Sequence, residues 1–469
     1  MAFLIGGANT ESAAYQIDNS GLFNDGQSQA LTRTHGASGS TRTFTFSCWV
    51  KFSDPKTGSS ASDCCHVIFA SEEEAGHQFF ISTDEGQIFR IADYQDSAYN
   101  LHLQTNRKFR DHSAWYHFCI IFDTTDGTQG DRCKLFVNGV RETSFSTEVY
   151  PSQNTDLYGN DNQAHFIGRR GGSNTMYFDG YIADVNFIDG TAAAATEFGE
   201  TNDNGVWIPK KYGGSYGNNG FFLEFGNTGT GQGANKFASD TSGNGNHYDT
   251  NNFSGQYQMT DTPTNNFCTL NPLHKSTTDV VLSKGNTEVV SGYSSGWQHC
   301  AATMAVRNGK WYWEAKAETV SATDKTSIGV FQFDTTDVDF IGFTNTDRSS
   351  KGISGHGAGT GSYSYADDDI IMCGMDLDNN KVYWGKNGTW FGSLDPAAGS
   401  GSTTQTIDNS NFCVPAVGGY GGSIWQLNFG NPTFSISSGN TDANGYGNFE
   451  YSVPSGFFAL NTKNLAEYG

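Results

Sequence analysis

The chain has 469 residues, of which only 16% are charged while 14% are aromatic, and glycine occurs 58 times. This length suits two or three domains rather than one core, and the composition favours strands joined by tight turns over long helices. The formal net charge of −22 argues against nucleic acid and anionic membranes as partners, because both attract clustered lysine and arginine.

The use of cysteine predicts folding in a reducing compartment. The nine cysteines are odd in number, and their spacings match no CxxC metal pair. Four of them lie inside apolar runs, where a free thiol behaves as a small core residue; these are Cys48, Cys119, Cys373 and Cys413. We expect reduced thiols and a cytoplasmic origin, and leave open whether the adjacent Cys64 and Cys65 pair. The N-terminus lacks the basic start of a signal peptide.

Residues 1–40 are polar and rich in glycine and serine, and they predict an N-terminal arm. Short strands with turn residues between them follow over residues 41–190, which is typical of a β-sandwich. Four motifs succeed one another there, namely Trp115-x-His117, Asn138-Gly139, Ile167-Gly168 and Gly180-x-Ile182. In this order they resemble the laminin-G-like, concanavalin-A-like lectin family. That resemblance implies a sandwich fold and leaves function open, since such sandwiches serve lectins, enzymes and adhesion modules.

Residues 191–285 predict a bridging region that contains short strands and turn-rich loops. The segment Pro263–Asn271 is echoed near the C-terminus by Pro454–Asn461, which suggests an extended segment that docks beside each sandwich. A stretch of this length without structure of its own is uncommon. We therefore expect it to add strands to one or both domains.

A second sandwich is predicted over residues 286–432, followed by a C-terminal segment over 433–469. Its clearest part is 363–392, where Ile370–Leu377 alternates as a strand and Asn387-Gly388 predicts a hairpin turn. Six features in order resemble the SPRY family; they are Gly309-x-Trp311-Tyr312-Trp313-Glu314, Ile328-Gly329-Val330, Asp376-x-Asp378, Asn387-Gly388, Pro415-Ala416-Val417 and Asn428-Phe429-Gly430. The resemblance implies a bent sandwich that binds partners through loops at one end. The expected fold class is therefore all-β, with two antiparallel sandwiches joined by a strand-rich bridge.

Three acidic loops were considered as calcium sites, since hard cations prefer oxygen ligands. The loops are Asp367–Asp369, Asp376–Asn380 and Asp240–Asn246. The second begins like an EF-hand, but Lys381 stands where glycine is required and Asn387 replaces the bidentate glutamate. Solvated turns explain all three better, so no metal or cofactor is predicted and calcium stays an alternative.

No catalytic residue is predicted, and we expect the protein not to be an enzyme. Glycoside hydrolysis needs two facing carboxyl groups, whereas Glu314 and Glu318 on one strand face would stand roughly 13 Å apart. The run Glu72–Glu74 suits a solvated face. His112 and His117 are separated by an odd number of positions, which places them on opposite faces of a strand.

Aromatic residues near predicted turns of the second sandwich are the candidate ligand-binding residues. They are Tyr363, Tyr365, Trp390 and Tyr420. Aromatic rings at a rim stack on sugar faces or anchor protein contacts. The alternative is that these rings pack in the core or between sheets.

The bridge motifs Val206–Tyr212 and Thr262–Leu273, together with the order of the two sandwiches, resemble virion structural proteins of marine bacteriophages of the tail-fibre, receptor-binding or head-surface type. The resemblance implies an adhesive, homo-oligomeric protein of the virion surface, made in the host bacterial cytoplasm. Its partners would be other virion proteins and a host-surface glycan or protein. A capsid decoration or fibre protein and a polysaccharide depolymerase are the alternatives.

Overall fold

A computed structural model gives the structure of the chain. It describes residues 4–5, 15–53, 55, 65–74, 76–172, 176–292, 298–320, 326–333, 350–354, 365–401, 407, 410–419 and 421–469. These residues form two compact units. We call Glu11–Thr264 the first unit, and Met1–Thr10 with Asn265–Gly469 the second unit.

The fold is all-β, as the composition predicts, and its strands pair almost entirely antiparallel. One short α-helix, α2 (Thr462–Tyr468), follows the last strand and begins at an Asn461 cap whose side chain accepts a hydrogen bond from the Asn464 backbone. Among the described residues, no helix has the length and hydropathy that crossing a membrane requires.

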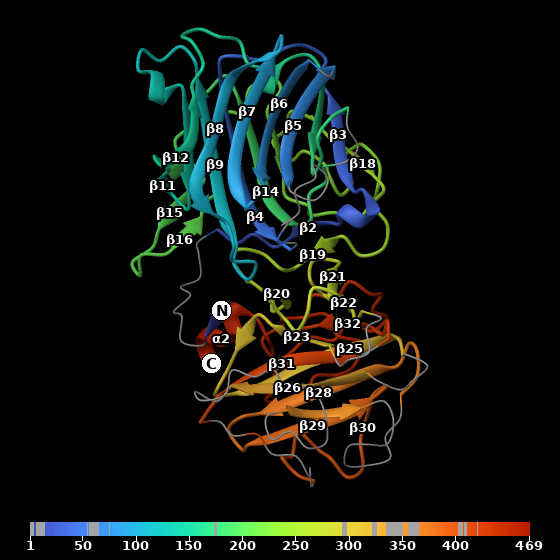
Figure 1. The fold of residues 1–469 in the computed structure, drawn as a ribbon. Helices are drawn as coiled ribbons and strands as arrows, with labels where there is room; N and C mark the ends of the chain where they lie inside the picture. The colour runs from blue at the N-terminus through green and yellow to red at the C-terminus, as the bar shows by residue number, and fades with distance from the viewer. Residues whose placement is uncertain are drawn as a thin grey trace. The chain divides into compact units, whose positions relative to one another are not determined.

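The first unit consists of two eight-stranded sheets (Figure 1). The first, which we call the β4 sheet, is ordered β11 (Val140–Arg141), β10 (Cys133–Val137), β9 (Tyr116–Asp123), β4 (Thr43–Phe52), β14 (Gly180–Asp189), β2 (Ser20–Phe23) and β19 (Gln258–Met259), with β17 (Phe221–Leu223) paired to β14. The second, the β6 sheet, is ordered β12 (Phe145–Val149), β8 (Ala98–Lys108), β7 (Ile88–Gln95), β6 (His77–Asp84), β5 (Val67–Glu74), β13 (Ala164–Ile167), β3 (Ala30–Thr34) and β18 (Asp249–Asn251). A separate hairpin joins β15 (Gly199–Thr201) to β16 (Trp207–Pro209).

The two sheets enclose a core that is rich in phenylalanine. Phe44 stacks on Phe122 of the same sheet at 4.5 Å and meets Phe79 of the β6 sheet edge to face at 5.9 Å. Such offset and edge-to-face pairs are favourable beyond the area that they bury. The alternation of Phe44, Phe46 and Cys48 in β4 points these side chains into the core.

Most of the predicted bridging region belongs to the first unit, because the division falls between Thr264 and Asn265. Its strand β17 extends the β4 sheet beside β14, and β18 extends the β6 sheet beside β3. The segment also covers the outer face of the β4 sheet, where Phe198 packs with Ile121 and Ile188. The bridge thus completes a sandwich whose other strands lie far earlier in the chain.

The second unit contains a five-stranded and an eight-stranded sheet. The five-stranded sheet is ordered β20 (Leu270–Lys275), β23 (Gln298–Ala302), β31 (Phe412–Gly419), β26 (Thr326–Phe333) and β27 (Ser350–Ser354). The eight-stranded sheet is ordered β21 (Val281–Ser283), β22 (Glu288–Val290), β32 (Ile424–Asn428), β25 (Lys310–Thr319), β28 (Ile370–Asp376), β29 (Lys381–Lys386) and β30 (Thr389–Trp390), with β33 (Phe458–Ala459) paired to β25. In addition, β1 (Leu4–Ile5) pairs in parallel with β24 (Met304–Ala305).

The hairpin predicted at Asn387-Gly388 is present between β29 and β30. Both residues adopt positive φ angles, 48° and 82°, as a two-residue hairpin of this type requires. The preceding turn places Asn380 at a φ of 58°. The turn chemistry of this stretch therefore fixes three strands of the eight-stranded sheet.

A buried ion pair holds the end of the first unit onto the β4 sheet. The Lys51 ammonium lies 2.7 Å from Asp261 Oδ2, and the two side chains are 1% and 0% exposed. The Trp115 indole donates to the other carboxylate oxygen at 3.0 Å. Removing one member of such a pair leaves its partner charged and out of water, which is strongly unfavourable.

We expect Lys51→Met to lower the free energy of unfolding by about 3–5 kcal/mol, because the Asp261 carboxylate would lose its counter-ion in the interior. The matched control is Lys211→Met, since Lys211 pairs with Glu224 at the surface, at 3.4 Å. That change is expected to cost less than about 1 kcal/mol. Urea unfolding of the full chain gives both values, and equal losses in the two variants would refute this assignment.

Two histidines stack in the interior of the first unit. The rings of His35 and His165 lie 3.6 Å apart with an interplanar angle of 14°. Burial lowers the pKa of His165 to about 4. Burial, the neighbouring His165 ring and Arg33 all lower the pKa of His35. Both rings are therefore neutral in the folded protein at neutral pH.

Acid is expected to destabilise the protein through this pair. An unfolded histidine has a pKa of about 6.5, so the stability that the neutral rings provide is complete above that pH and is lost as the pH falls towards 4. Between pH 7.5 and 5, we expect the wild type to lose about 2 kcal/mol more stability than His35→Phe, whose ring cannot titrate. Urea unfolding at the two pH values measures this. The same loss in both proteins would show that His35 does not contribute.

Candidate functional site

The outer face of the β6 sheet carries a groove built by alternation along its strands. In β7, Phe89 and Ile91 point into the core. Because neighbouring residues of a strand face opposite ways, Arg90 and Tyr94 lie on the outer face. In the same register Arg90 is paired with Ser82 of β6, and Tyr94 with Gln78.

Small residues hollow this face. Phe80 of β6 is paired with Ala70 of β5 on one side and with Ala92 of β7 on the other. The resulting groove has a volume of about 460 Å³ and is lined by Cys65, Val67, Gln78, Phe80, Ser82, Arg90, Tyr94, Tyr99, Arg170 and Met176. Pockets that hold small ligands are of this size.

Two tyrosines present aromatic surface in the groove. The rings of Tyr94 and Tyr99 meet edge to face at 5.0 Å, and Tyr99 stacks on His102 at 4.4 Å. Tyr99 is 39% exposed, which is unusual for a large apolar side chain of this protein. Burial and the nearby Arg90 charge lower the pKa of His102, so its ring is neutral at pH 7.

Arg90 is held in place by a network within the groove. Its Nη1 lies 3.1 Å from Asp84 Oδ2 and its Nη2 donates to the Tyr99 hydroxyl at 2.8 Å. Gln104 also donates to Asp84, at 2.9 Å. The guanidinium lies 4.8 Å from the centre of the Phe80 ring. A side chain fixed in this way offers its remaining N–H groups with little loss of entropy on binding.

Arg170 also lies near this ring, with its guanidinium 5.8 Å from the centre of Phe80. It donates to the Gln78 side-chain oxygen and, at 3.9 Å, to the sulfur of Met176. Together the groove therefore offers aromatic faces, hydroxyl and amide groups, and two guanidinium donors. This combination can hold a polar ligand that has apolar faces.

Of the four candidate residues predicted from the sequence, the structure describes Tyr365 and Trp390. Tyr363 and Tyr420 lie outside the described residues. Tyr365 is only 4% exposed and its ring lies 5.4 Å from that of Trp425, so it lies in the core rather than at an exposed rim. Trp390 is half-buried and packs edge to face with Tyr312 at 6.4 Å. Tyr365 therefore packs in the core, which is the alternative given for these rings.

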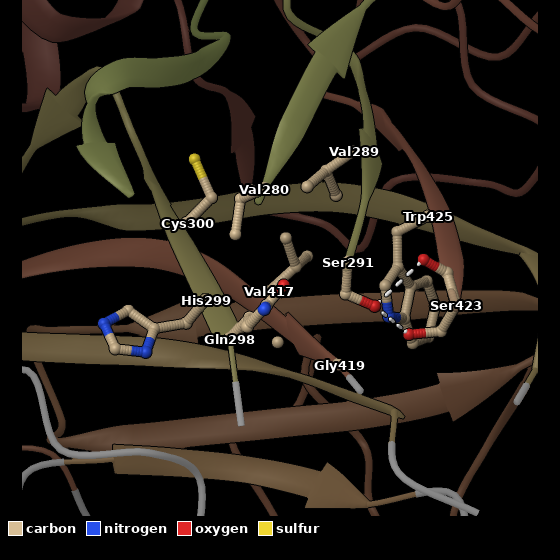
Figure 2. A pocket seen from close by; sticks show the side chains of 11 residues that line it. Val280, Val289, Ser291, Gln298, His299, Cys300, Val417, Gly419, Ser423 and Trp425 are labelled. Atoms are coloured by element: carbon tan, nitrogen blue, oxygen red, sulfur yellow. Dashed lines mark hydrogen bonds between the residues drawn. The ribbon is translucent and has the colours of Figure 1, made fainter. Parts of the chain in front are cut away.

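The second unit has a small pocket between its two sheets, shown in Figure 2. Apolar side chains such as Val280, Val289 and Val417 line it, and the Ser291 hydroxyl lies 2.6 Å from that of Ser423 at its edge. Its volume of about 10 Å³ is enough for about one water molecule. It is therefore too small for a saccharide or a peptide side chain.

The acidic loop Asp240–Asn246 is a turn stabilised by its own backbone. The Asp240 carboxylate accepts hydrogen bonds from the backbone N–H groups of Phe222, Ser242 and Asn246 at 2.7–2.9 Å. Its oxygens are thus already engaged, as an aspartate turn requires. In the described part of the chain, no group of three or more His, Cys, Asp or Glu side chains could hold a metal ion.

A buried serine and histidine form a structural pair rather than a nucleophile and base. The Trp207 indole, which can only donate, donates to His117 Nδ1 at 3.1 Å. The ring proton therefore lies on Nε2, which donates to the Ser47 hydroxyl at 2.9 Å. Burial also lowers the pKa of His117 to about 3, so this imidazole is not placed to accept the serine proton.

Sequence reasoning missed the groove because its residues come from four strands and two loop segments. The signal available was the alternation in IFRIADYQ (88–95), where polar and aromatic residues share the face opposite to Phe89 and Ile91. That pattern predicts an outer face but not a hollow. The hollow depends on Ala70 and Ala92 lying beside Phe80, which follows from the strand register.

The comparisons with known proteins concern the fold. Residues 24–197 match the model of the Concanavalin A-like lectin/glucanases superfamily, and they include nearly all of the β6 sheet. This part of the chain thus has a concanavalin A-like lectin fold, as its four motifs predict. No curated protein matches the chain.

Several solved structures are partly similar to the chain. A putative carbohydrate binding protein from Bacteroides ovatus is 14% identical, with 50% of this chain and 59% of that chain covered and a TM-score of 0.31. The SPRY domain of human HERC1 is 18% identical, with 34% and 96% covered and a TM-score of 0.26. A heptameric SAP-like pentraxin from Limulus polyphemus is 14% identical, with 39% and 80% covered and a TM-score of 0.29.

Proposed function

We propose that the protein is an adhesive carbohydrate-binding protein and that the groove of the β6 sheet holds the saccharide. The observation that supports this most is the exposed Tyr99 ring beside Tyr94, in a hollow that also contains Arg90, Gln78 and Ser82. The groove lies in the part of the chain that has the concanavalin A-like lectin fold.

The chemistry of the groove suits a sugar ring. A pyranose has a C–H face, which packs on an aromatic ring, and hydroxyl groups at its edge, which need hydrogen-bond partners. Tyr99 supplies the ring, and its hydroxyl orients Arg90 for the edge. Tyr99 therefore contributes to stacking on the C–H face and to the hydrogen bonds of the hydroxyl groups, and its removal should weaken both interactions.

We propose the virion surface as the setting, with other virion proteins and a host-surface glycan as partners and with a homo-oligomer as the working form. The motifs that resemble marine bacteriophage proteins support this. Cys48, Cys119, Cys133, Cys300 and Cys373 are buried free thiols, which suits synthesis in a reducing bacterial cytoplasm. Immunogold electron microscopy of purified particles should locate the protein at a head or tail surface. Particles that lack the protein would contradict the setting but not the sugar binding.

The groove predicts that Tyr99→Ala weakens glycan binding about tenfold or more, because stacking and the Arg90 contact are lost together. The purified full chain is screened on an array of neutral and acidic bacterial glycans, and the dissociation constant of the best probe is then measured by calorimetry. Tyr99→Phe is the matched control, since it keeps the ring and removes only the hydroxyl that Arg90 contacts.

Unfolding midpoints of both variants show whether they are folded. Wild-type affinity in folded Tyr99→Ala would place the site elsewhere. A wild-type chain that binds no glycan on the array would contradict the function itself.

A further inference from the structure

The two arginines of the groove differ in how their charges are balanced. Arg90 forms an ion pair with Asp84 at 3.1 Å. Arg170 is bound only by an amide oxygen and a thioether sulfur, both uncharged, and no ion pair involves it in the described residues. Two surface arginines elsewhere in the unit, Arg42 and Arg141, form ion pairs with Asp156 and Asp131.

Glu72, the described carboxyl group that interacts with the Arg170 charge, does not line the groove. Glu72 on β5 is buried, and burial raises the pKa of its carboxyl, while the Arg170 and Arg169 charges lower it. Its Oε1 accepts from the Gln78 amide at 3.2 Å rather than from Arg170. Among the described residues, the lining of the groove therefore has two guanidinium groups and no carboxylate, in a chain whose net charge is −22.

We propose that the saccharide of this groove is anionic, and that Arg170 binds its carboxylate or sulfate group while Tyr99 stacks on the ring. The inference rests on the proposed sugar-binding function. A guanidinium binds planar and tetrahedral oxyanions through parallel N–H donors, and such charge-assisted bonds are about twice as strong as neutral ones.

The contacts of Arg170 leave donors for this anion. Each terminal nitrogen of a guanidinium carries two N–H groups, and Arg170 uses one on each nitrogen, to Gln78 and to Met176. The thioether is a weak acceptor, so an oxyanion would replace it at little cost. A neutral sugar would gain less from the same contacts, because it cannot form charge-assisted hydrogen bonds with Arg170.

The test uses calorimetry of the full chain with three probes, namely tetragalacturonate for the carboxylate, a sulfated galactan tetrasaccharide for the sulfate, and maltotetraose as the neutral probe. We expect at least one anionic probe to bind about tenfold more tightly than maltotetraose. Arg170→Gln should abolish that difference and leave maltotetraose unchanged. Raising the salt concentration from 50 to 500 mM should weaken only the anionic probe.

The matched control is Arg141→Gln, which removes the same charge from the edge strand β11 of the β4 sheet. It should leave all three affinities unchanged. If both variants lost the same affinity for the anionic probe, the net charge of the protein would explain the preference, and the inference would be wrong. A preference for maltotetraose, or an anionic preference that survives in Arg170→Gln, would also overturn it while sugar binding stands. If Tyr99→Ala bound every probe with wild-type affinity, both the placement of the sugar in the groove and the inference about its charge would be wrong.

Discussion

The structure depends on one constraint: successive side chains of a strand point to opposite faces of the sheet. When one face packs in the core, the side chains of the other face must contact either another part of the chain or solvent. In the first unit the inward faces form a common phenylalanine core. The outward faces of the two sheets differ in whether other segments of the chain cover them. The outer face of the β4 sheet is covered by other parts of the chain, so β4 and β14 are buried on both sides. The outer face of the β6 sheet carries the groove.

The segments that cover the β4 sheet explain two buried polar side chains that could otherwise be taken for catalytic residues. Lys51 and His117 lie on its outer face, and each is bound by a residue from a segment that covers it, Asp261 and Trp207 respectively. These contacts fix the covering segments because the buried polar groups must be satisfied. The same burial removes Lys51 and His117 from any substrate.

The sequence predicted the parts of the fold that depend on local pattern. Alternation in Ile370–Leu377 and the Asn387-Gly388 turn identified a strand and a hairpin, because side-chain period and positive φ are properties of neighbouring residues. It did not predict that Lys51 is buried, and it left open whether Tyr365 lies in the core. Those outcomes depend on partners far along the chain, Asp261 and Trp425. The groove was not predicted for the same reason, since its floor is formed by the register of three strands.

The groove differs from the rest of the protein in composition, and this difference is the strongest reason to regard it as a binding site. Ala70 and Ala92 leave space where larger residues would have continued the apolar packing around Phe80. Tyr99 stays exposed and Arg170 is left with neutral partners. Filling the hollow and pairing the charge would both stabilise the free protein. A surface that keeps the space, the exposed ring and a guanidinium hydrogen-bonded only to neutral described groups is best explained by a ligand that binds there.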